Sequence, residues 1–215
     1  MILPKGKWGW IRAGVLTGVL AALVGYVYLI PAARLAGYAR REGDIVFQSV
    51  PHGDLVDAIE GITGSPYSHC GVVVREGGAW LVIESIGEVR ETPLSSWVRR
   101  GRADRFAVYR LKPPYAKNIP RFIAELRPFL GRPYDYRYQM DDESLYCSEL
   151  VWKAYKNATG EELGALVKLG DMNWKPFEET IRKYEGGPPP LDRLMITPRH
   201  LSEAKQLEKV FGGDF

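Results

Sequence analysis

The sequence predicts an α+β fold, in which an antiparallel β-sheet packs with helices and is preceded by a transmembrane helix. Short apolar runs bounded by turn residues predict the strands, and helically spaced apolar residues toward either end of the domain predict the helices. One uncharged run of 21 residues lies ahead of both. The 215 residues therefore divide into an N-terminal segment, 1–41, and a single domain, 42–215.

The uncharged run at residues 13–33 is long enough to cross a bilayer. At ~1.5 Å per residue, a helix of this length spans roughly 31 Å. Trp8 and Trp10 lie near one end and Tyr26 and Tyr28 approach the other, as interfacial aromatic residues do. We therefore expect a single-pass membrane anchor, with bilayer lipid as its partner.

A cleaved signal peptide is the alternative interpretation, because small residues at 31–33 resemble a cleavage site. The apolar run is longer than a usual signal core, which favours the uncleaved anchor. Basic residues both precede and follow the run, so the positive-inside rule favours a cytoplasmic N-terminus only slightly. That orientation places the domain outside the cytoplasm.

The strands of the domain are predicted by short apolar runs. The Gly77-Gly78 pair separates two of these runs and predicts a tight hairpin. The strands expected are residues 45–47, 70–74, 80–85, 89–92, 106–111 and 191–196.

The helices are predicted by apolar spacing. In residues 118–130, for example, the apolar positions recur at three- and four-residue intervals, and the glycine and proline at 131 and 133 end the pattern. The helices expected are residues 55–62, 94–98, 118–130, 145–158 and 199–210.

The charge and cysteine content exclude several classes of function. Six of the 29 basic residues and none of the 26 acidic residues fall in 1–41, so the domain carries 23 basic and 26 acidic residues. A weakly acidic domain gives no electrostatic basis for nucleic-acid binding. With two cysteines and no CxxC pair, the chain indicates neither a disulfide-rich scaffold nor a zinc site, and we expect no metal or cofactor.

Cys147 lies at the start of the helical run 145–158. The free backbone N–H groups of a first helical turn favour a thiolate there, and the N–H of Cys147 itself can donate to an oxyanion. The alternative is a buried structural cysteine. A disulfide with Cys70 is a further alternative if the domain lies outside the cytoplasm.

His69 and Glu84 supply the other parts of a nucleophile–base pair. Because strand residues alternate, His69 and Cys70 point to opposite faces, and a core-facing Cys70 turns His69 toward a cleft. A neutral imidazole there can take the thiol proton. Glu84 ends an apolar strand that the hairpin pairs with the His69 strand, so its carboxylate can orient the imidazole. A structural histidine and a solvent-facing glutamate are the alternatives.

Five short motifs resemble, in order and spacing, the YiiX/YebB-like branch of the NlpC/P60 superfamily. These proteins are papain-like cysteine hydrolases whose chain order is circularly permuted, and the resemblance covers roughly residues 42–210. The closing segment 196–201 is also similar to the family's C-terminal segment. The motifs lie at residues 43–47, 63–73, 84–85, 131–135 and 146–151.

The resemblance implies a permuted papain-like fold with Cys147 as nucleophile, His69 as base and Glu84 as orienting acid. Tyr134 and Tyr146 become candidates for binding substrate or donating to the oxyanion, although an aromatic packed under the cysteine helix is the alternative for Tyr134. Cys70 stands where the family more usually has an aliphatic residue. We expect Cys70 to pack as a small hydrophobe without further effect.

The function that follows is a membrane-anchored cysteine hydrolase, an amidase or peptidase or a thiol-dependent acyl hydrolase, which forms an acyl-enzyme on Cys147. The expected substrate is a lipid-linked or cell-wall peptide or amide. Because related permuted members process lipids, a lipid acyltransferase on the same fold is one alternative. A non-catalytic lipid- or peptide-binding module is another.

Overall fold

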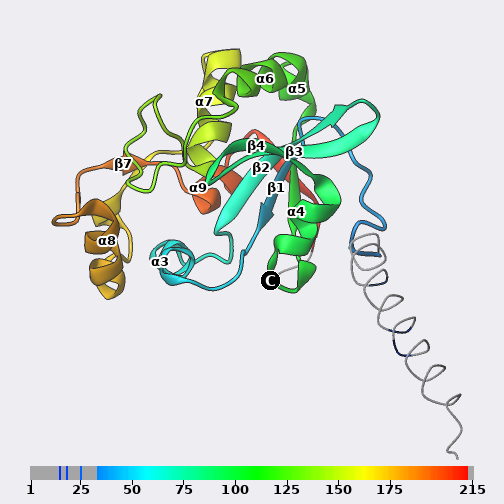
Figure 1. The fold of residues 1–215 in the computed structure, drawn as a ribbon. Helices are drawn as coiled ribbons and strands as arrows, with labels where there is room; N and C mark the ends of the chain where they lie inside the picture. Colours follow the sequence, from blue (N-terminus) through cyan, green and yellow to red (C-terminus); the bar gives the residue numbers. More distant parts are fainter. Residues whose placement is uncertain (1–14, 16–17, 19–24, 26–32, 213–215) are drawn as a thin grey trace, which may run out of the picture.

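The computed structural model describes residues 15, 18, 25 and 33–212, which form an α+β fold around an antiparallel sheet (Figure 1). The six strands of this sheet lie in the order β4-β3-β2-β1-β5-β8, and every neighbouring pair is antiparallel. The strands are β1 (Ile45–Gln48), β2 (His69–Glu76), β3 (Ala79–Ile86), β4 (Glu88–Pro93), β5 (Ala107–Leu111) and β8 (Leu207–Phe211). A second sheet pairs β6 (Val167–Lys168) with β7 (Leu194–Met195).

Helices cover both faces of the large sheet (Figure 1). On one face, α6 and α7 pack against a core that includes Val72 and Val74. On the other face, α4 and residues 35–38 pack against Val73 and its neighbours. The alternation of side chains along β2 therefore supplies both cores. The helices are α3 (Asp54–Thr63), α4 (Leu94–Arg100), α5 (Pro113–Ala116), α6 (Ile119–Leu126), α7 (Cys147–Thr159), α8 (Glu178–Glu185) and α9 (Pro198–Ser202).

The hairpin between β2 and β3 forms as the sequence predicts. Gly77 and Gly78 have φ values of 55° and 86°, a left-handed pair that L-residues with side chains rarely adopt. The turn sets a register in which Gly71 lies opposite Glu84. Residues of odd number on β2 thus share one face of the sheet with Glu84.

The segment that leads into β1 is fixed to the domain by a buried carboxylate. Asp44 is fully buried and accepts hydrogen bonds from the Tyr38 hydroxyl at 2.7 Å and from two guanidinium nitrogens of Arg110 at 2.7 and 2.8 Å. Leu35 and Tyr38 are also buried. The packed part of the chain therefore includes residues that lie ahead of β1.

The predicted helix at residues 199–210 is confirmed at its start and is wrong beyond Ser202. The helix α9 ends at Ser202, a turn follows, and Leu207–Phe211 form β8, which pairs with the outer edge of β5. This pairing satisfies backbone groups of β5 across a long sequence separation, which local helical spacing does not report. The predicted strand 191–196 is shorter than expected, because only Leu194–Met195 forms a strand.

The predicted helix 118–130 also ends early. The α-helix α6 stops at Leu126 and a 3₁₀ turn follows over Arg127–Phe129. Pro128 lacks an N–H group and so cannot continue the hydrogen-bond ladder of the helix. The other predicted helices are found near their expected positions.

The predicted membrane span, residues 13–33, lies outside the described residues except at positions 15, 18, 25 and 33. Among the residues that the structure describes, no helix is long and apolar enough to cross a membrane. The span stays a prediction.

Candidate active site

Cys147 is the first residue of α7 and is almost completely buried, with 2% of its surface exposed. The helix starts here because the Glu149 carboxylate accepts a hydrogen bond from the Tyr146 N–H at 3.2 Å. The hydroxyl of Ser148 donates to the Ile196 carbonyl at 2.9 Å and holds the first turn against the segment before α9. The thiol therefore lies at the positive end of a fixed helix.

The structure brings His69 and Glu84 into direct contact. His69 Nε2 lies 2.5 Å from Glu84 Oε2, and both side chains are buried. The imidazole lies on the sheet face that carries Trp97, with ring centroids 6.2 Å apart. Because Nε2 is occupied by Glu84, Nδ1 is the nitrogen left for the hydrogen bond between His69 and Cys147.

Glu84 has further partners that the sequence did not indicate. Thr92 donates to Oε1 at 2.6 Å, Arg100 donates to the same oxygen that meets His69, and Arg90 Nε lies 4.0 Å from Oε1. Arg90 is the direct cross-strand neighbour of Glu84, and Thr92 lies two residues further along β4 on the same face. Strand alternation on β4 could have indicated these two residues, whereas no sequence pattern indicated Arg100.

These contacts shift the pKa of each acid–base group. Burial raises the pKa of Glu84, but the hydrogen bond and charge of His69, together with Arg100 and Thr92, bring it down to about 2. Burial lowers the pKa of His69, yet hydrogen bonds and charges from Cys147 and Glu84 raise it to about 9. The carboxylate and the imidazolium are therefore both charged at neutral pH.

The thiol of Cys147 has a pKa well below its usual range. A hydrogen bond from Cys70 is the largest cause and outweighs burial, and the hydrogen bond and charge of His69 add to it. Burial and the neighbouring Cys147 raise the pKa of Cys70, so Cys70 keeps its proton. At neutral pH the site holds a thiolate, an imidazolium and a carboxylate in sequence.

Cys70 packs in the core, as expected, but the expectation that it has no further effect is wrong. It is fully buried on the sheet face that meets α7. Its thiol donates a hydrogen bond to the sulfur of Cys147. Both cysteines are free in the structure, so the alternative of a disulfide between them is not observed.

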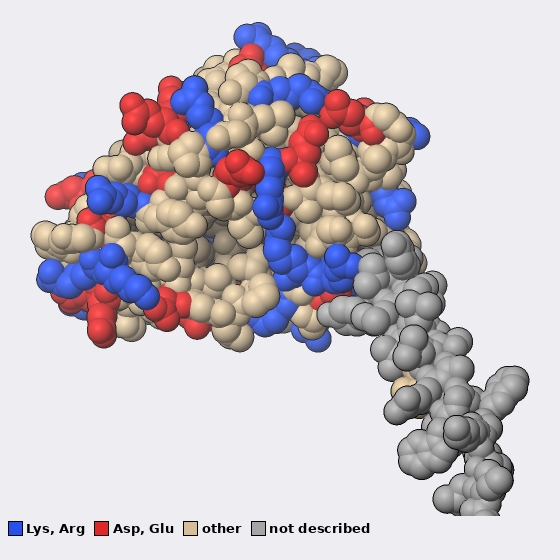
Figure 2. All heavy atoms as spheres, in the orientation of Figure 1, with Lys and Arg blue, Asp and Glu red and all other residues tan. Residues whose placement is uncertain are grey.

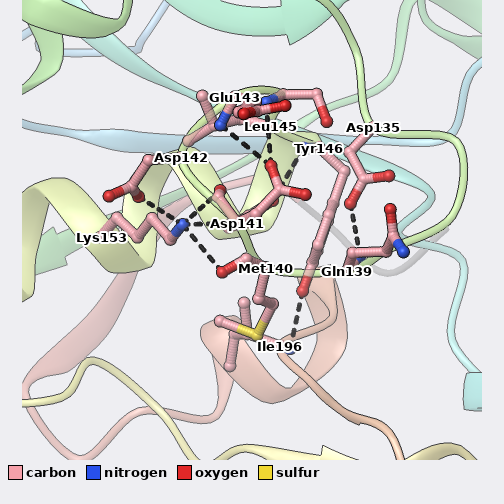
Figure 3. A network of polar contacts seen from close by, with 12 residues as sticks. Asp135, Gln139, Met140, Asp141, Asp142, Glu143, Leu145, Tyr146, Lys153 and Ile196 are labelled. Carbon is pink, nitrogen blue, oxygen red and sulfur yellow. Dashed lines mark hydrogen bonds and ion pairs between the residues drawn. The ribbon is translucent and has the colours of Figure 1, made fainter.

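The two predicted tyrosines occupy different positions. The Tyr134 hydroxyl lies 3.3 Å from the hydroxyl of Tyr138, a residue that the sequence did not single out. The Tyr146 ring packs against Tyr138 with centroids 4.5 Å apart, and its hydroxyl accepts a hydrogen bond from the Ile196 N–H at 3.1 Å (Figure 3). Only Tyr138 of these three lines the cavity beside Cys147.

Residues 134–145, here called the strap, run from Tyr134 to the start of α7. Asp135 is buried and accepts hydrogen bonds from the backbone N–H groups of residues 137 and 139. Lys153 donates to the carbonyl groups of Met140, at 3.0 Å, and Asp141 (Figure 3). These contacts hold Tyr138 and Met140 at φ values of 56° and 60°, which cost energy in non-glycine residues. The strap is therefore a fixed wall of the site.

A cavity of about 80 Å³ opens beside Cys147. Its walls come from α3, α8, the strap and the segment before α9, and nearly all of its lining is apolar. In the space-filling view, a hollow near the middle of the visible face is bordered mostly by uncharged residues (Figure 2). The thiolate therefore faces an apolar binding site.

The fold and the Cys–His–Glu set resemble those of papain-like cysteine amidases whose chain order is permuted. A family model described as "Permuted papain-like amidase enzyme, YaeF/YiiX, C92 family" matches residues 39–211, and the chain belongs to this family. The uncharacterized protein YiiX of Escherichia coli K12 is 32% identical over 171 residues, covering 78% of this chain and 84% of that protein.

A crystal structure of YiiX from Escherichia coli O157:H7 has the same fold, with a TM-score of 0.74 and 30% identity over 82% of this chain and 99% of the other. That protein is described as a metalloprotein. Among the described residues of this chain, no group of three or more His, Cys, Asp or Glu side chains could hold a metal ion. The described residues therefore do not fit a metal site, and we assign no step to one.

Proposed function

We propose that the protein hydrolyses an amide through an acyl-enzyme on Cys147, with His69 as acid–base and Glu84 as orienting acid. The observation that carries this proposal is the 2.5 Å contact of Glu84 with His69 Nε2, which leaves Nδ1 for the thiol. The membership in a permuted papain-like amidase family supports the same reaction.

The reaction would take two steps. The Cys147 thiolate attacks the amide carbonyl, and the backbone N–H groups at the start of α7 stabilise the oxyanion. As the C–N bond breaks, His69 gives its Nδ1 proton to the leaving amine. Neutral His69 then takes a proton from water, whose oxygen attacks the thioester. Breaking the C–S bond releases a carboxylic acid and restores the thiolate–imidazolium pair.

We further propose that this chemistry takes place at a membrane surface, outside the cytoplasm. The uncharged run 13–33 and the slight excess of positive charge ahead of it support this location. The apolar cavity supports a lipid-linked substrate in preference to a peptide of the cell wall. Protease added to spheroplasts that carry the full chain should degrade the domain, and protection of the domain would contradict this orientation.

The reaction can be tested with an activated acyl ester such as p-nitrophenyl decanoate. Wild-type protein should gain the mass of the acyl group, and Cys147→Ala and His69→Ala should not. His52→Ala is the matched control for His69, because His52 is exposed and pairs with Asp57. Labelling that persists in Cys147→Ala, on Cys70 or elsewhere, would remove Cys147 as the nucleophile. Product masses would also show whether the acyl group passes to water or to another acceptor.

A further inference from the structure

We propose that the substrate is an apolar acyl chain whose amide nitrogen carries a small anionic group, and that Arg137 binds this anion. An N-acyl amino acid is the simplest compound of this class. The inference rests on the proposed amide hydrolysis and adds the chemistry of the two halves of the substrate.

The apolar walls of the cavity indicate the apolar acyl chain of the substrate. The lining residues include Leu55, Ile59 and Ile62 of α3 and Ile181 of α8. Cys147 also lines the cavity. The volume of about 80 Å³ is several times the ~10–15 Å³ that a single water needs. A site of this size and composition gains free energy from apolar atoms, and it gives water few polar partners.

The charged residues at the cavity indicate the anionic group on the amide nitrogen of the substrate. Apart from the Cys147 thiolate, whose charge His69 compensates, only Arg137 and Glu185 are charged among the described lining residues. Both carboxylate oxygens of Glu185 are bound by Arg193, with one pair at 3.1 Å, so the acidic charge is already compensated. Within the described part of the chain, the Arg137 guanidinium makes no ion pair or side-chain hydrogen bond. The cavity thus has one uncompensated positive charge.

Arg137 is held in place by its backbone. Its N–H donates to Asp135 at 2.8 Å, and its carbonyl accepts a hydrogen bond from Arg193. The side chain itself is exposed at the rim of the cavity, where a guanidinium can bind a carboxylate through two parallel hydrogen bonds. The strap therefore fixes the backbone that carries this cation, and the side chain lines the same cavity as Cys147.

The two-step reaction decides which half of the substrate lies inside. The acyl group stays on Cys147 until water releases it, so the enclosed apolar wall suits the acyl chain. The amine leaves after the first step, and the exposed rim at Arg137 suits a charged group that must depart to solvent. The acyl chain is thus placed in the cavity and the anion at Arg137.

The test compares three amides of one fatty acid at submicellar concentration, using the full chain in nonionic detergent. N-Decanoylglycine is anionic, N-decanoylethanolamine is neutral and N-decanoylethylenediamine is cationic, and released decanoate is measured by mass spectrometry. We expect kcat/KM to be at least about tenfold higher for the anionic than for the neutral amide, because only the anionic amide forms a charged hydrogen-bonded pair with Arg137. The cationic amide should be the poorest substrate.

Two variants test whether Arg137 causes the preference for the anionic amide. Arg137→Gln should abolish it by raising KM for the anionic amide alone, and Arg137→Glu should reverse it. Arg121→Gln is the matched control, because Arg121 lies on α6, outside the cavity lining, and its removal changes net charge equally. The control should retain the wild-type preference.

The outcomes separate the two proposals. Equal kcat/KM for the three amides, a preference that survives in Arg137→Gln, or acylation by p-nitrophenyl decanoate without cleavage of any amide would each overturn the inference. Failure of Cys147 to be acylated even by that activated ester would overturn the proposed function, and the inference with it.

Discussion

Replacement of Glu84 by Gln tests how much the buried carboxylate contributes to the basicity of His69. The hydrogen bonds and charges of Cys147 and Glu84 raise the pKa of His69 from 6.5 to about 9, against the effect of burial. At 1.36 kcal/mol per pKa unit, this elevation corresponds to about 3 kcal/mol. Because burial opposes the two charged contacts, their combined effect exceeds this net elevation. Glu84 supplies one of the two contacts, so Glu84→Gln should remove at least ~1.5 kcal/mol.

The expected result is a fall of at least about one unit in the pKa of His69 and a loss of at least about tenfold in kcat/KM. A histidine whose folded pKa is raised stabilises the protein below its unfolded pKa and loses that contribution as pH rises through about 9. In Glu84→Gln this loss should begin at lower pH. The chain has three histidines, so the imidazole resonances can be followed individually by NMR.

The control is Glu88→Gln, which removes an exposed carboxylate at the start of β4. It should leave the titration of His69 and the catalytic rate unchanged. A wild-type pKa of His69 in Glu84→Gln would refute the reasoning, because it would show that Cys147 alone raises the basicity of the imidazole.

Three other substitutions test the surroundings of the site. Burial raises the pKa of Glu149 from 4.5 to about 7, so its contribution to stability is lost as pH rises through that range. Glu149→Gln should therefore unfold at higher temperature than wild type at about pH 8 but not at about pH 5, and identical curves at both would contradict this. Lys153→Met frees two strap carbonyls and should lower stability by ~1–3 kcal/mol. It should also speed amide hydrogen exchange across residues 137–144, and unchanged exchange would show that other contacts hold the strap. Gly71→Ala would place a Cβ 2.5 Å from a Val82 methyl and 2.9 Å from the Ile83 carbonyl. It should cost ~1–3 kcal/mol and displace Glu84, with an unchanged Tm as the contrary result.

Much of the candidate site could be predicted because it depends on short-range rules. Strand alternation places His69 and Cys70 on opposite faces of the sheet. The two-glycine turn fixes the register of β2 with β3, and so decides that Glu84 lies on the same face as His69. The helix start at Cys147 follows from a local capping pattern, in which Glu149 accepts from the backbone. Each of these features is encoded within a few residues of sequence.

The remaining partners come from elements that are distant in the chain. Arg100 reaches Glu84 only because α4 packs on the same sheet face, and Cys70 reaches Cys147 only because α7 packs on the other. Tyr138 is positioned by a left-handed backbone that the strap contacts impose on a non-glycine residue. The strand β8 depends in the same way on the unpaired edge of β5. Packing decides these features, and local propensity does not report packing.

The packing of residues 35–44 on the domain limits how far the domain could lie from a membrane anchor. Leu35 is already packed on the domain, and it lies two residues after the end of the predicted span 13–33. Two extended residues reach ~7 Å, so the domain of an anchored chain would have almost no tether. Its cavity would stay at one height above the bilayer. An enzyme held in this way would meet substrates that diffuse laterally in the same membrane. The substrate concentration available to it would be set by the number of substrate molecules per area of membrane.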